Sequence, residues 1–243
     1  MRGTAELYED LYNAVGDIGR YAHFVAVEGS EYRASPVRLM VVGRAVNGWV
    51  TLPSHSAKAF GAAARERSEQ TGFAWVAGEG DNMRSRHDEN YRLNRSPFWR
   101  VTRRILAGLC GCDTGGRWIE RIAWSNLYKV SPRSGGNPSN ALCRSEIIPC
   151  RAILSEEIER LSPTHIFMPV GWRWFQSDER YDFSRLFCDV VRQDRDGRSP
   201  VEGSARFALS GGGVPAVIAA RPEFRAERLY ADSVLDCFRT MAI

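Results

Sequence analysis

Two kinds of apolar pattern alternate along this chain. Short, β-branched apolar runs that stop at glycine or at a polar residue are typical of buried β-strands, whereas apolar residues spaced three or four apart are typical of amphipathic helices. The first pattern predicts buried strands at residues 37–43, Ile122–Asn126 and 164–170. It also predicts two further strands, 207–209 and 214–220, joined by the glycine-rich turn at 210–213.

The second pattern predicts helices between and around these strands. Pro97 stands at the start of one of them, a position that proline favours, and Pro163 follows the end of another. The expected helices cover residues 4–28, 55–69, 97–109, Asn140–Leu161 and 223–241. Because strands alternate with helices, the sequence predicts an α/β fold, a three-layer α/β/α sandwich with a mainly parallel central sheet. We expect a single domain over residues 1–243, with its core at about 37–241.

Two segments fit neither pattern. Residues 78–95 are polar and aperiodic, and their length makes them either a functional flap or a mobile loop. Residues 194–204 indicate an ordinary polar loop.

Composition narrows the class of protein. The 243 residues are 44% hydrophobic and 26% charged, which excludes disordered and collagen-like chains and allows a sizeable core. No apolar run approaches the ~20 residues of a membrane span, and residues 1–20 lack the continuous apolar block of a signal peptide. We therefore expect a cytoplasmic, monomeric protein that does not contact membranes.

The charged and potential metal-binding side chains restrict the possible functions less than the overall composition does. The 33 Lys plus Arg exceed the 29 Asp plus Glu by four, and only Lys58 and Lys129 are lysines, so arginine supplies most of the positive charge. This excess permits nucleic-acid binding without requiring it. The six cysteines contain no C-x-x-C pair and the four histidines show no metal-binding spacing. We expect reduced thiols, no metal and no cofactor.

Three loops that follow expected strands carry candidate chemistry. In an open α/β sheet, ligands bind beyond the carboxyl ends of the strands, which here lead into residues 43–49, 125–129 and 220–225. Gly43 allows a ligand to approach the backbone closely, and the Asn126 amide offers one acceptor and two donors. Each residue also has an ordinary structural explanation, as a turn glycine or as an asparagine that caps backbone groups.

The order of these loops resembles that of the uracil-DNA glycosylase superfamily. That superfamily has a glycine-rich first motif, a Pro-Phe pair carrying a stacking ring, a strand ending in Asn and a late His-Pro-Ser motif. The corresponding stretches are GRAVNGW at 43–49, SPFW at 96–99, WSNLYKVSPRSGGNPS at 124–139 and AARPEFR at 219–225. Between the last two, CRAILSEEIERLSPTHIFMPVG at 150–171 is similar to the superfamily's long helix and glycine-ended strand. The resemblance spans about residues 37–225 and implies a uracil-DNA glycosylase-like fold.

The resemblance also implies a role for each site residue. Phe98 would stack on a base turned out of the nucleic acid, and Asn126 would match the O4 and N3–H edge of uracil. The backbone at Gly43 and Arg44 would hold a uracil oxygen or a water, and Trp49 would form a wall of the pocket. Phe98 and Trp49 are also residues that commonly fill a core.

Departures from the family pattern bear on catalysis. Hydrolysis of an N-glycosidic bond is helped by an acceptor that aligns water and by a donor that stabilises the departing base. In the superfamily an Asp or Asn of the first motif aligns the water, and the corresponding residue here is Ala45. Some branches of the superfamily also have alanine at this position and remain active. In the late motif, Arg221 replaces the expected His and Glu223 replaces the expected Ser. Arg221 would either stabilise the anion of the departing base or hold a phosphate. One branch of the superfamily binds an iron–sulfur cluster, but only Cys150 of this chain matches a ligand position of that branch. One cysteine is too few to hold such a cluster.

Basic residues between 84 and 104 form the densest positive region, interleaved with Tyr91, Phe98 and Trp99. This pattern is typical of a surface that binds a nucleic-acid backbone, and equally of a solvated helix face. The residues expected to meet the backbone are Arg100, Arg103, Arg104, Lys129 and Ser131.

Two functions of different class follow. In the first, the protein is a hydrolase of N-glycosyl bonds that binds a flipped uracil or other deaminated base and removes it in base-excision repair of DNA. Its catalytic positions are Ala45 and Arg221, and its base-binding positions are Gly43, Arg44, Phe98 and Asn126. In the second, the same fold is catalytically inactive and binds a nucleobase, a nucleotide or a nucleic acid.

Overall fold

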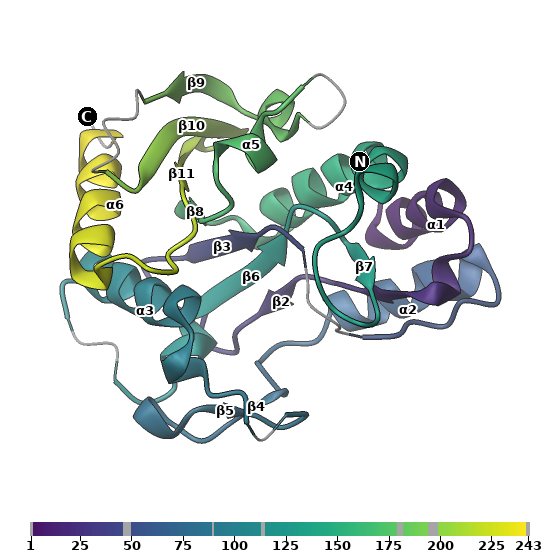
Figure 1. Cartoon of the computed structure of the whole chain (residues 1–243), viewed down its shortest axis with the longest axis horizontal. Helices are drawn as coiled ribbons and strands as arrows, with labels where there is room; N and C mark the ends of the chain where they lie inside the picture. Colours follow the sequence, from purple (N-terminus) through teal and green to yellow (C-terminus); the bar gives the residue numbers. More distant parts are fainter. Residues whose placement is uncertain are drawn as a thin grey trace.

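The computed structural model describes residues 2–45, 50–88, 90–112, 115–178, 182–193 and 199–241. Within these residues, seven strands form one mixed sheet in the order β2-β6-β3-β8-β11-β10-β9 (Figure 1). Every residue of β3 and β6 is buried, which explains the unbroken apolar run of β3 and the apolar start of β6 in the sequence. The strands are β2 (Val27–Glu28), β3 (Leu39–Gly43), β6 (Ile122–Asn126), β8 (His165–Met168), β9 (Cys188–Arg192), β10 (Val201–Leu209) and β11 (Gly212–Ala219).

The four central strands of this sheet are parallel. β3 pairs in parallel with β6 and with β8, and β8 pairs in parallel with β11. The outer strands β2, β10 and β9 pair antiparallel to their neighbours. The prediction of a mainly parallel sheet is therefore right for the centre and wrong for the outer strands, because the hairpin between β10 and β11 reverses the chain.

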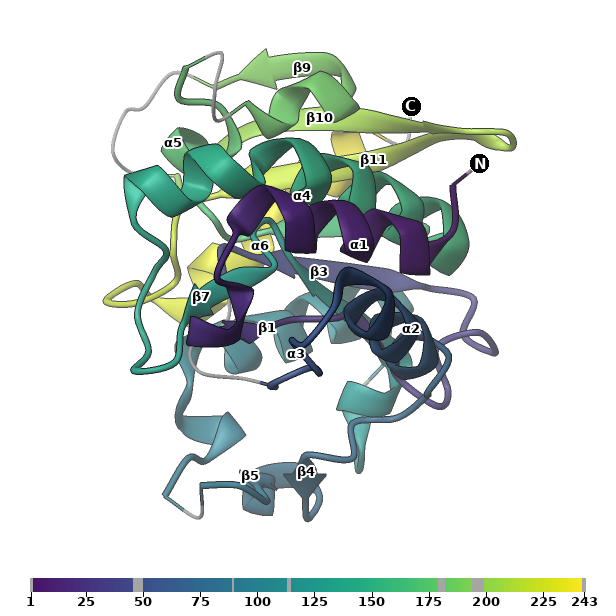
Figure 2. The same ribbon diagram turned by 90° about the vertical axis from the view of Figure 1, so that its right-hand side faces the viewer.

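Helices cover both faces of the sheet. α1 (Thr4–Val15), α2 (Ala57–Ser68) and α4 (Asn140–Leu161) pack on one face (Figure 2), and α3 (Pro97–Cys110) and α6 (Glu227–Met241) pack on the other. Alternate residues of β3 therefore point to opposite faces of the sheet. Met40 and Val42 belong to the core beside α4, here called the α4-side core. Leu39 and Val41 belong to the α3-side core. The arrangement agrees with the predicted α/β class.

The expected helix over residues 4–28 ends much earlier, at Val15. Gly16 then adopts a φ of 76°, a left-handed conformation that glycine accommodates readily and that stops the helix. The residues after it form a 3-10 turn, η1 (Ile18–Arg20), and two short strands, β1 (Tyr21–His23) and β2. β1 pairs with β7 (Val130–Pro132) and β2 with β6, so strand pairing over a long sequence distance overrides the helical spacing.

Other elements differ from expectation because they are short or are formed by distant partners. The segment 78–95 is held by the hairpin of β4 (Val76–Ala77) with β5 (Arg84–Ser85) and by two buried side chains, Met83 and Leu93. β10 begins at Val201, inside the expected polar loop, of which residues 194–198 lie outside the described residues. Short helical elements complete the described chain: η2 (Gly80–Asn82), η3 (Leu93–Arg95), η4 (Trp118–Arg121), α5 (Trp172–Phe175) and η5 (Phe183–Leu186).

The connections place a switch point beside β3. The chain passes from β3 to β6 on one side of it, and then through α4 to β8 on the other side. In open α/β sheets, the crevice beyond the carboxyl ends at such a point is the usual ligand site. In the described part of the chain, no helix combines the length and apolar character that crossing a membrane requires.

Candidate functional site

The loops after β3 and β6 run side by side at the carboxyl edge of the sheet. Gly43 is the register partner of Asn126, and the backbone N–H groups of Leu127 and Tyr128 donate to the carbonyl oxygens of Gly43 and Arg44 at 2.8 and 2.9 Å. The pairing therefore continues past the strand ends. It fixes where the side chain of Asn126 lies relative to the first loop.

Asn126 is the residue at this edge with unmet hydrogen-bonding capacity. Its side chain is 2% exposed, and its Nδ2 atom is buried without a partner among the described residues. A Cβ added at Gly43 would overlap Asn126 Oδ1, so only glycine leaves room for the amide in this position. A buried donor without an acceptor costs about 1–3 kcal/mol, and a ligand oxygen would remove that cost.

Phe98 lies on the same face of the sheet as Asn126. In β6, Ile122 and Trp124 belong to the α3-side core, and Asn126 follows them at the same alternation. The half-buried Phe98 packs on that core and stands perpendicular to Trp99, 4.7 Å between ring centroids. Trp99 in turn lies 5.2 Å from Trp124. The rings of Phe98, Trp99 and Trp124 thus form a continuous set of contacts from α3 to β6.

Arg44 occupies the crevice between the carboxyl ends of β3 and β8. Its Nε donates to the carbonyl oxygen of Val170 at 2.6 Å, and its guanidinium lies 5.2 Å from the centroid of the Trp174 ring. Burial, together with the nearby positive charge of Arg221, lowers the pKa of Arg44 to about 10. Val170 and Trp174 belong to the α4-side core, so Arg44 points away from Phe98.

Arg221 stands just beyond β11 and is bound by an acidic neighbour. Its Nε lies 3.1 and 3.0 Å from the two carboxylate oxygens of Glu223, and its Nη2 donates to the same group. Phe224 follows with a φ of 62°, a left-handed conformation, and its side chain is fully exposed. The loop therefore presents an unprotected aromatic ring next to the Arg221–Glu223 pair.

The other residues of the motif at 43–49 add no polar group to the candidate site among the residues that the structure describes. Ala45 is half-buried and packs against the α4-side core, so its methyl group offers no polar atom to this edge. Asn47 and Trp49, the latter expected to wall the pocket, lie outside the described residues.

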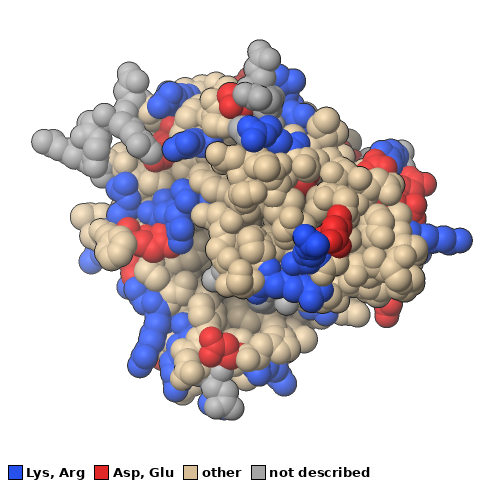
Figure 3. Space-filling model, turned by 45° about the vertical axis from the view of Figure 1, so that its right-hand side comes forward, with Lys and Arg blue, Asp and Glu red and all other residues tan. Residues whose placement is uncertain are grey.

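The three arginines of α3 that were expected to meet a nucleic-acid backbone have acidic partners. Arg100 and Arg104 both pair with Glu227 of α6, and Arg103 lies 3.7 Å from Asp81. They line a cavity of about 360 Å³ together with Trp99 and Trp118. On the face shown in Figure 3, Lys and Arg groups likewise lie in part beside Asp or Glu and in part on neutral surface. Much of the charge of α3 is therefore neutralised within the protein.

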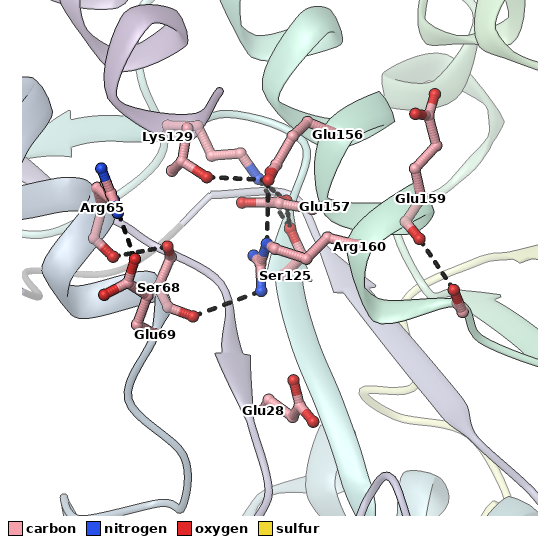
Figure 4. A network of polar contacts seen from close by, with 12 residues as sticks. Glu28, Arg65, Ser68, Glu69, Ser125, Lys129, Glu156, Glu157, Glu159 and Arg160 are labelled. Carbon is pink, nitrogen blue, oxygen red and sulfur yellow. Dashed lines mark hydrogen bonds and ion pairs between the residues drawn. The ribbon is translucent and has the colours of Figure 1, made fainter. Parts of the chain in front are cut away.

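Lys129 and Ser131 were expected to contact phosphates, and this assignment is wrong because both are fully buried. Lys129 Nζ donates to Glu157 Oε2, Ser125 Oγ and the carbonyl oxygen of Asn126, each at 2.7 Å (Figure 4). The ammonium thus connects the end of β6 to the C-terminal part of α4. Lys129 positions Asn126 by holding the turn that follows it.

A second buried carboxylate, Glu146 of α4, lies close to the same turn. Its Oε2 accepts from the backbone N–H of Val130 at 3.0 Å and from Cys150 Sγ at 3.3 Å. Burial raises the pKa of Glu146 to about 8 and raises the pKa of the Cys150 thiol as well. Glu146 is therefore protonated over much of the neutral range, and Cys150 is an inert, buried thiol.

Among the residues that the structure describes, no group of three or more His, Cys, Asp or Glu side chains is arranged to hold a metal ion. A scan against protein-family models gives no match, and a search of curated proteins gives none either.

Sequence reasoning did not identify the roles that three residues have at this edge. Trp174 and Phe224 lie in short segments without periodicity, and no local pattern distinguishes them from core aromatics. Lys129 had a usable signal, since it is one of two lysines in a chain rich in arginine and it lies between apolar neighbours. The acid that pairs with it, Glu157, lies 28 positions later in the chain.

Replacing Lys129 tests its structural role. Lys129→Met should lower the free energy of unfolding by about 3–5 kcal/mol, because it leaves Glu157 charged and unpaired in the core. Urea unfolding measures the change. The double variant Lys129→Met, Glu157→Leu should recover most of the loss, and the exposed control Lys58→Met should change stability by less than about 0.5 kcal/mol. Unchanged stability together with weaker oligonucleotide binding would restore the phosphate role.

The pKa of Glu146 predicts a pH dependence of stability. The folded protein keeps this proton up to about pH 8, whereas the unfolded chain releases it near the ordinary value of 4.5. The folded state therefore binds more protons between these values, and the free energy of unfolding should fall as pH rises, by at most about 1.4 kcal/mol per unit. Urea unfolding at a series of pH values should show a smaller fall in Glu146→Gln, with the exposed Glu66→Gln as control. Identical pH profiles for Glu146→Gln and wild type would contradict the assignment.

Proposed function

We propose that this protein binds a nucleobase at the carboxyl edge of its sheet and releases it by hydrolysis, as a uracil-DNA glycosylase-like protein. The observation that carries the proposal is the buried, unpartnered Nδ2 of Asn126 over Gly43. Uracil offers a carbonyl oxygen and an N–H in adjacent positions, which an asparagine amide can match with one donor and one acceptor.

The placement of the other residues supports this function. Gly43 and Asn126 end two of the parallel strands and Arg221 lies two residues beyond a third, so all three lie at one edge. Phe98 lies on the same face as Asn126, where a base brought against its ring would recover part of the unstacking energy. These positions match the motifs through which the sequence resembles the superfamily.

The loop after β11 supplies two further groups with suitable chemistry. Positive charge develops on the sugar and negative charge on the leaving base as an N-glycosidic bond breaks, so a fixed donor near the base lowers the barrier. Arg221 is such a donor, and Glu223 orients its guanidinium. The fully exposed Phe224 is the kind of apolar side chain that proteins insert between base pairs to open a stack.

A second candidate function is binding without hydrolysis. Two observations favour it: Ala45 carries no group that could activate water, and the charge of Arg221 is already opposed by Glu223. The protein would then recognise a base, a nucleotide or a nucleic acid at the same amide. Experiments that separate binding from base release decide between the two functions.

The amide of Asn126 provides the first test. Asn126→Asp replaces its NH₂ donor with a carboxylate oxygen of similar size, and should weaken binding of uracil-containing single-stranded DNA by about tenfold or more, because a donor becomes an acceptor. Fluorescence anisotropy of a labelled oligonucleotide measures the affinity. Asn90→Asp makes the same chemical change on an exposed loop and should leave binding intact. Equal affinity for both variants and wild type would remove Asn126 from the site.

Arg221 separates the two functions. If hydrolysis occurs, Arg221→Ala should lower the single-turnover rate of base release by about 100- to 1000-fold with little change in affinity, because its charge acts on the leaving base. Release is followed with oligonucleotides containing uracil, hypoxanthine or xanthine, treated with alkali to cleave abasic sites. The binding function would be established instead if no base is released from any substrate although the oligonucleotides still bind. This result would have to hold for wild type, Arg221→Ala and Arg221→His.

A further inference from the structure

A larger cavity lies on the α4 side of the carboxyl edge, away from Phe98. It has a volume of about 730 Å³, within the range of pockets that hold small molecules, and it is formed between the start of α4, the helix α5 and the strand β9. Tyr128, Cys143 and Trp172 are the buried members of its wall. The other residues used below are Arg144, Arg173, Trp174 and Arg192.

The aromatic side chains of this cavity are held in fixed orientations. Trp174 is partly exposed, and its ring packs edge-on against Tyr128 at 5.6 Å. Trp172 is mostly buried and packs against Phe175 at 5.5 Å. Flat aromatic faces whose orientation is set by packing are suitable platforms for a nucleobase, because stacking needs no particular hydrogen-bond pattern.

Three arginines and one carboxylate, that of Asp178, line this cavity, so its described lining carries an excess of positive charge. Arg144, Arg173 and Arg192 are all exposed, and none forms an ion pair with a described residue. They differ in this from Arg100, Arg103 and Arg104 of α3, each of which has an acidic partner. The guanidinium of Arg192 lies 5.7 Å from the centroid of the Trp172 ring, which leaves the N–H groups at its edge available to an anion.

We infer that this cavity binds a nucleoside 5′-phosphate, with the base stacked on Trp174 and the phosphate held by Arg144, Arg173 and Arg192. The combination of fixed aromatic rings with unpaired guanidinium groups matches the two chemically distinct halves of a nucleotide. The N-terminus of α4, at Asn140, adds a smaller positive potential to the same side.

The ligand is either a free mononucleotide or one unit of a single-stranded nucleic acid. A second cavity, of about 540 Å³, shares Trp172 and Arg192 with the first and extends the hollow to Val190 of β9. Asp178 and Asp182 also line this second cavity, and their negative charge opposes further phosphate groups there. Arg44 stacks on Trp174 and connects the cavity with the candidate base site, but the inference does not depend on the proposed function.

Isothermal titration calorimetry of the full chain tests the inference. Adenosine 5′-monophosphate should bind more tightly than adenosine or ribose 5-phosphate, because only the nucleotide engages both halves of the cavity. A 5′-phosphorylated single-stranded pentanucleotide distinguishes the two sources: tighter binding than the mononucleotide indicates a nucleic acid, and equal or weaker binding indicates a free nucleotide.

Substitutions assign the binding to this cavity. The triple variant Arg144→Gln, Arg173→Gln, Arg192→Gln should lower the affinity for the mononucleotide by about tenfold for each arginine that contacts phosphate. The control triple variant Arg65→Gln, Arg228→Gln, Arg239→Gln removes the same charge from exposed positions on α2 and α6 and should bind as wild type does. Thermal melting checks that both variants fold, and Arg192→Gln alone replaces the first if it does not.

Two further variants separate this site from the candidate base site. Trp174→Leu should weaken binding of the mononucleotide and of adenosine by at least about fivefold, and leave ribose 5-phosphate unaffected. Asn126→Ala should leave mononucleotide binding unchanged, even if it abolishes recognition of uracil. The inference is overturned if wild type does not bind the mononucleotide, if ribose 5-phosphate binds equally well, or if the two triple variants lose affinity equally.

Discussion

The ammonium of Lys129 is the contact on which the carboxyl edge of this sheet depends. Lys129 lies in the turn after β6 and is fully buried, and two of its three acceptors come from β6 and the third from α4. A buried charge of this kind is stable only while its partners hold their positions, since loss of one leaves the others desolvated and unpaired. The strand, the turn and the helix are therefore fixed as a unit. Asn126 at the end of β6 and Tyr128 in the turn belong to the two sites considered above.

Two groups of arginines, those of α3 and the cavity residues Arg144, Arg173 and Arg192, have different consequences. Those of α3 share Glu227 and Asp81, so they contribute to the packing of α3 on α6 and leave little net field. Those around α5 have no acidic partner among the described residues, so their field extends into the cavity. The density of arginines along the sequence indicated the α3 group as the candidate nucleic-acid contact. The distribution of acidic side chains in space, which no linear pattern reveals, points to the second.

The sequence predicts best the elements whose pattern is local. β6 and α4 have the predicted limits, because one is a short apolar run that ends at polar residues and the other has a long helical repeat closed by Ser162 and Pro163. β1 and β7 were missed because each exists only through pairing with the other, about a hundred residues away along the chain. In the same way, the proximity of Gly43 to Asn126 could be predicted from two adjacent strand ends. The burial of Lys129 could not, because it depends on how α4 lies over β6.

The two edges of the sheet have a consequence for association between copies of the chain. β2 has only two residues, and at the opposite edge β9 pairs with β10 through a register shift between Ser204 and Arg206. Asp189 in β9 adopts a φ of 51°, which bends the outer strand away from regular geometry. A straight, open edge is a template on which another chain can add a strand and begin to aggregate. Here one edge is too short and the other too irregular for that, so the sheet is protected from growth by strand addition.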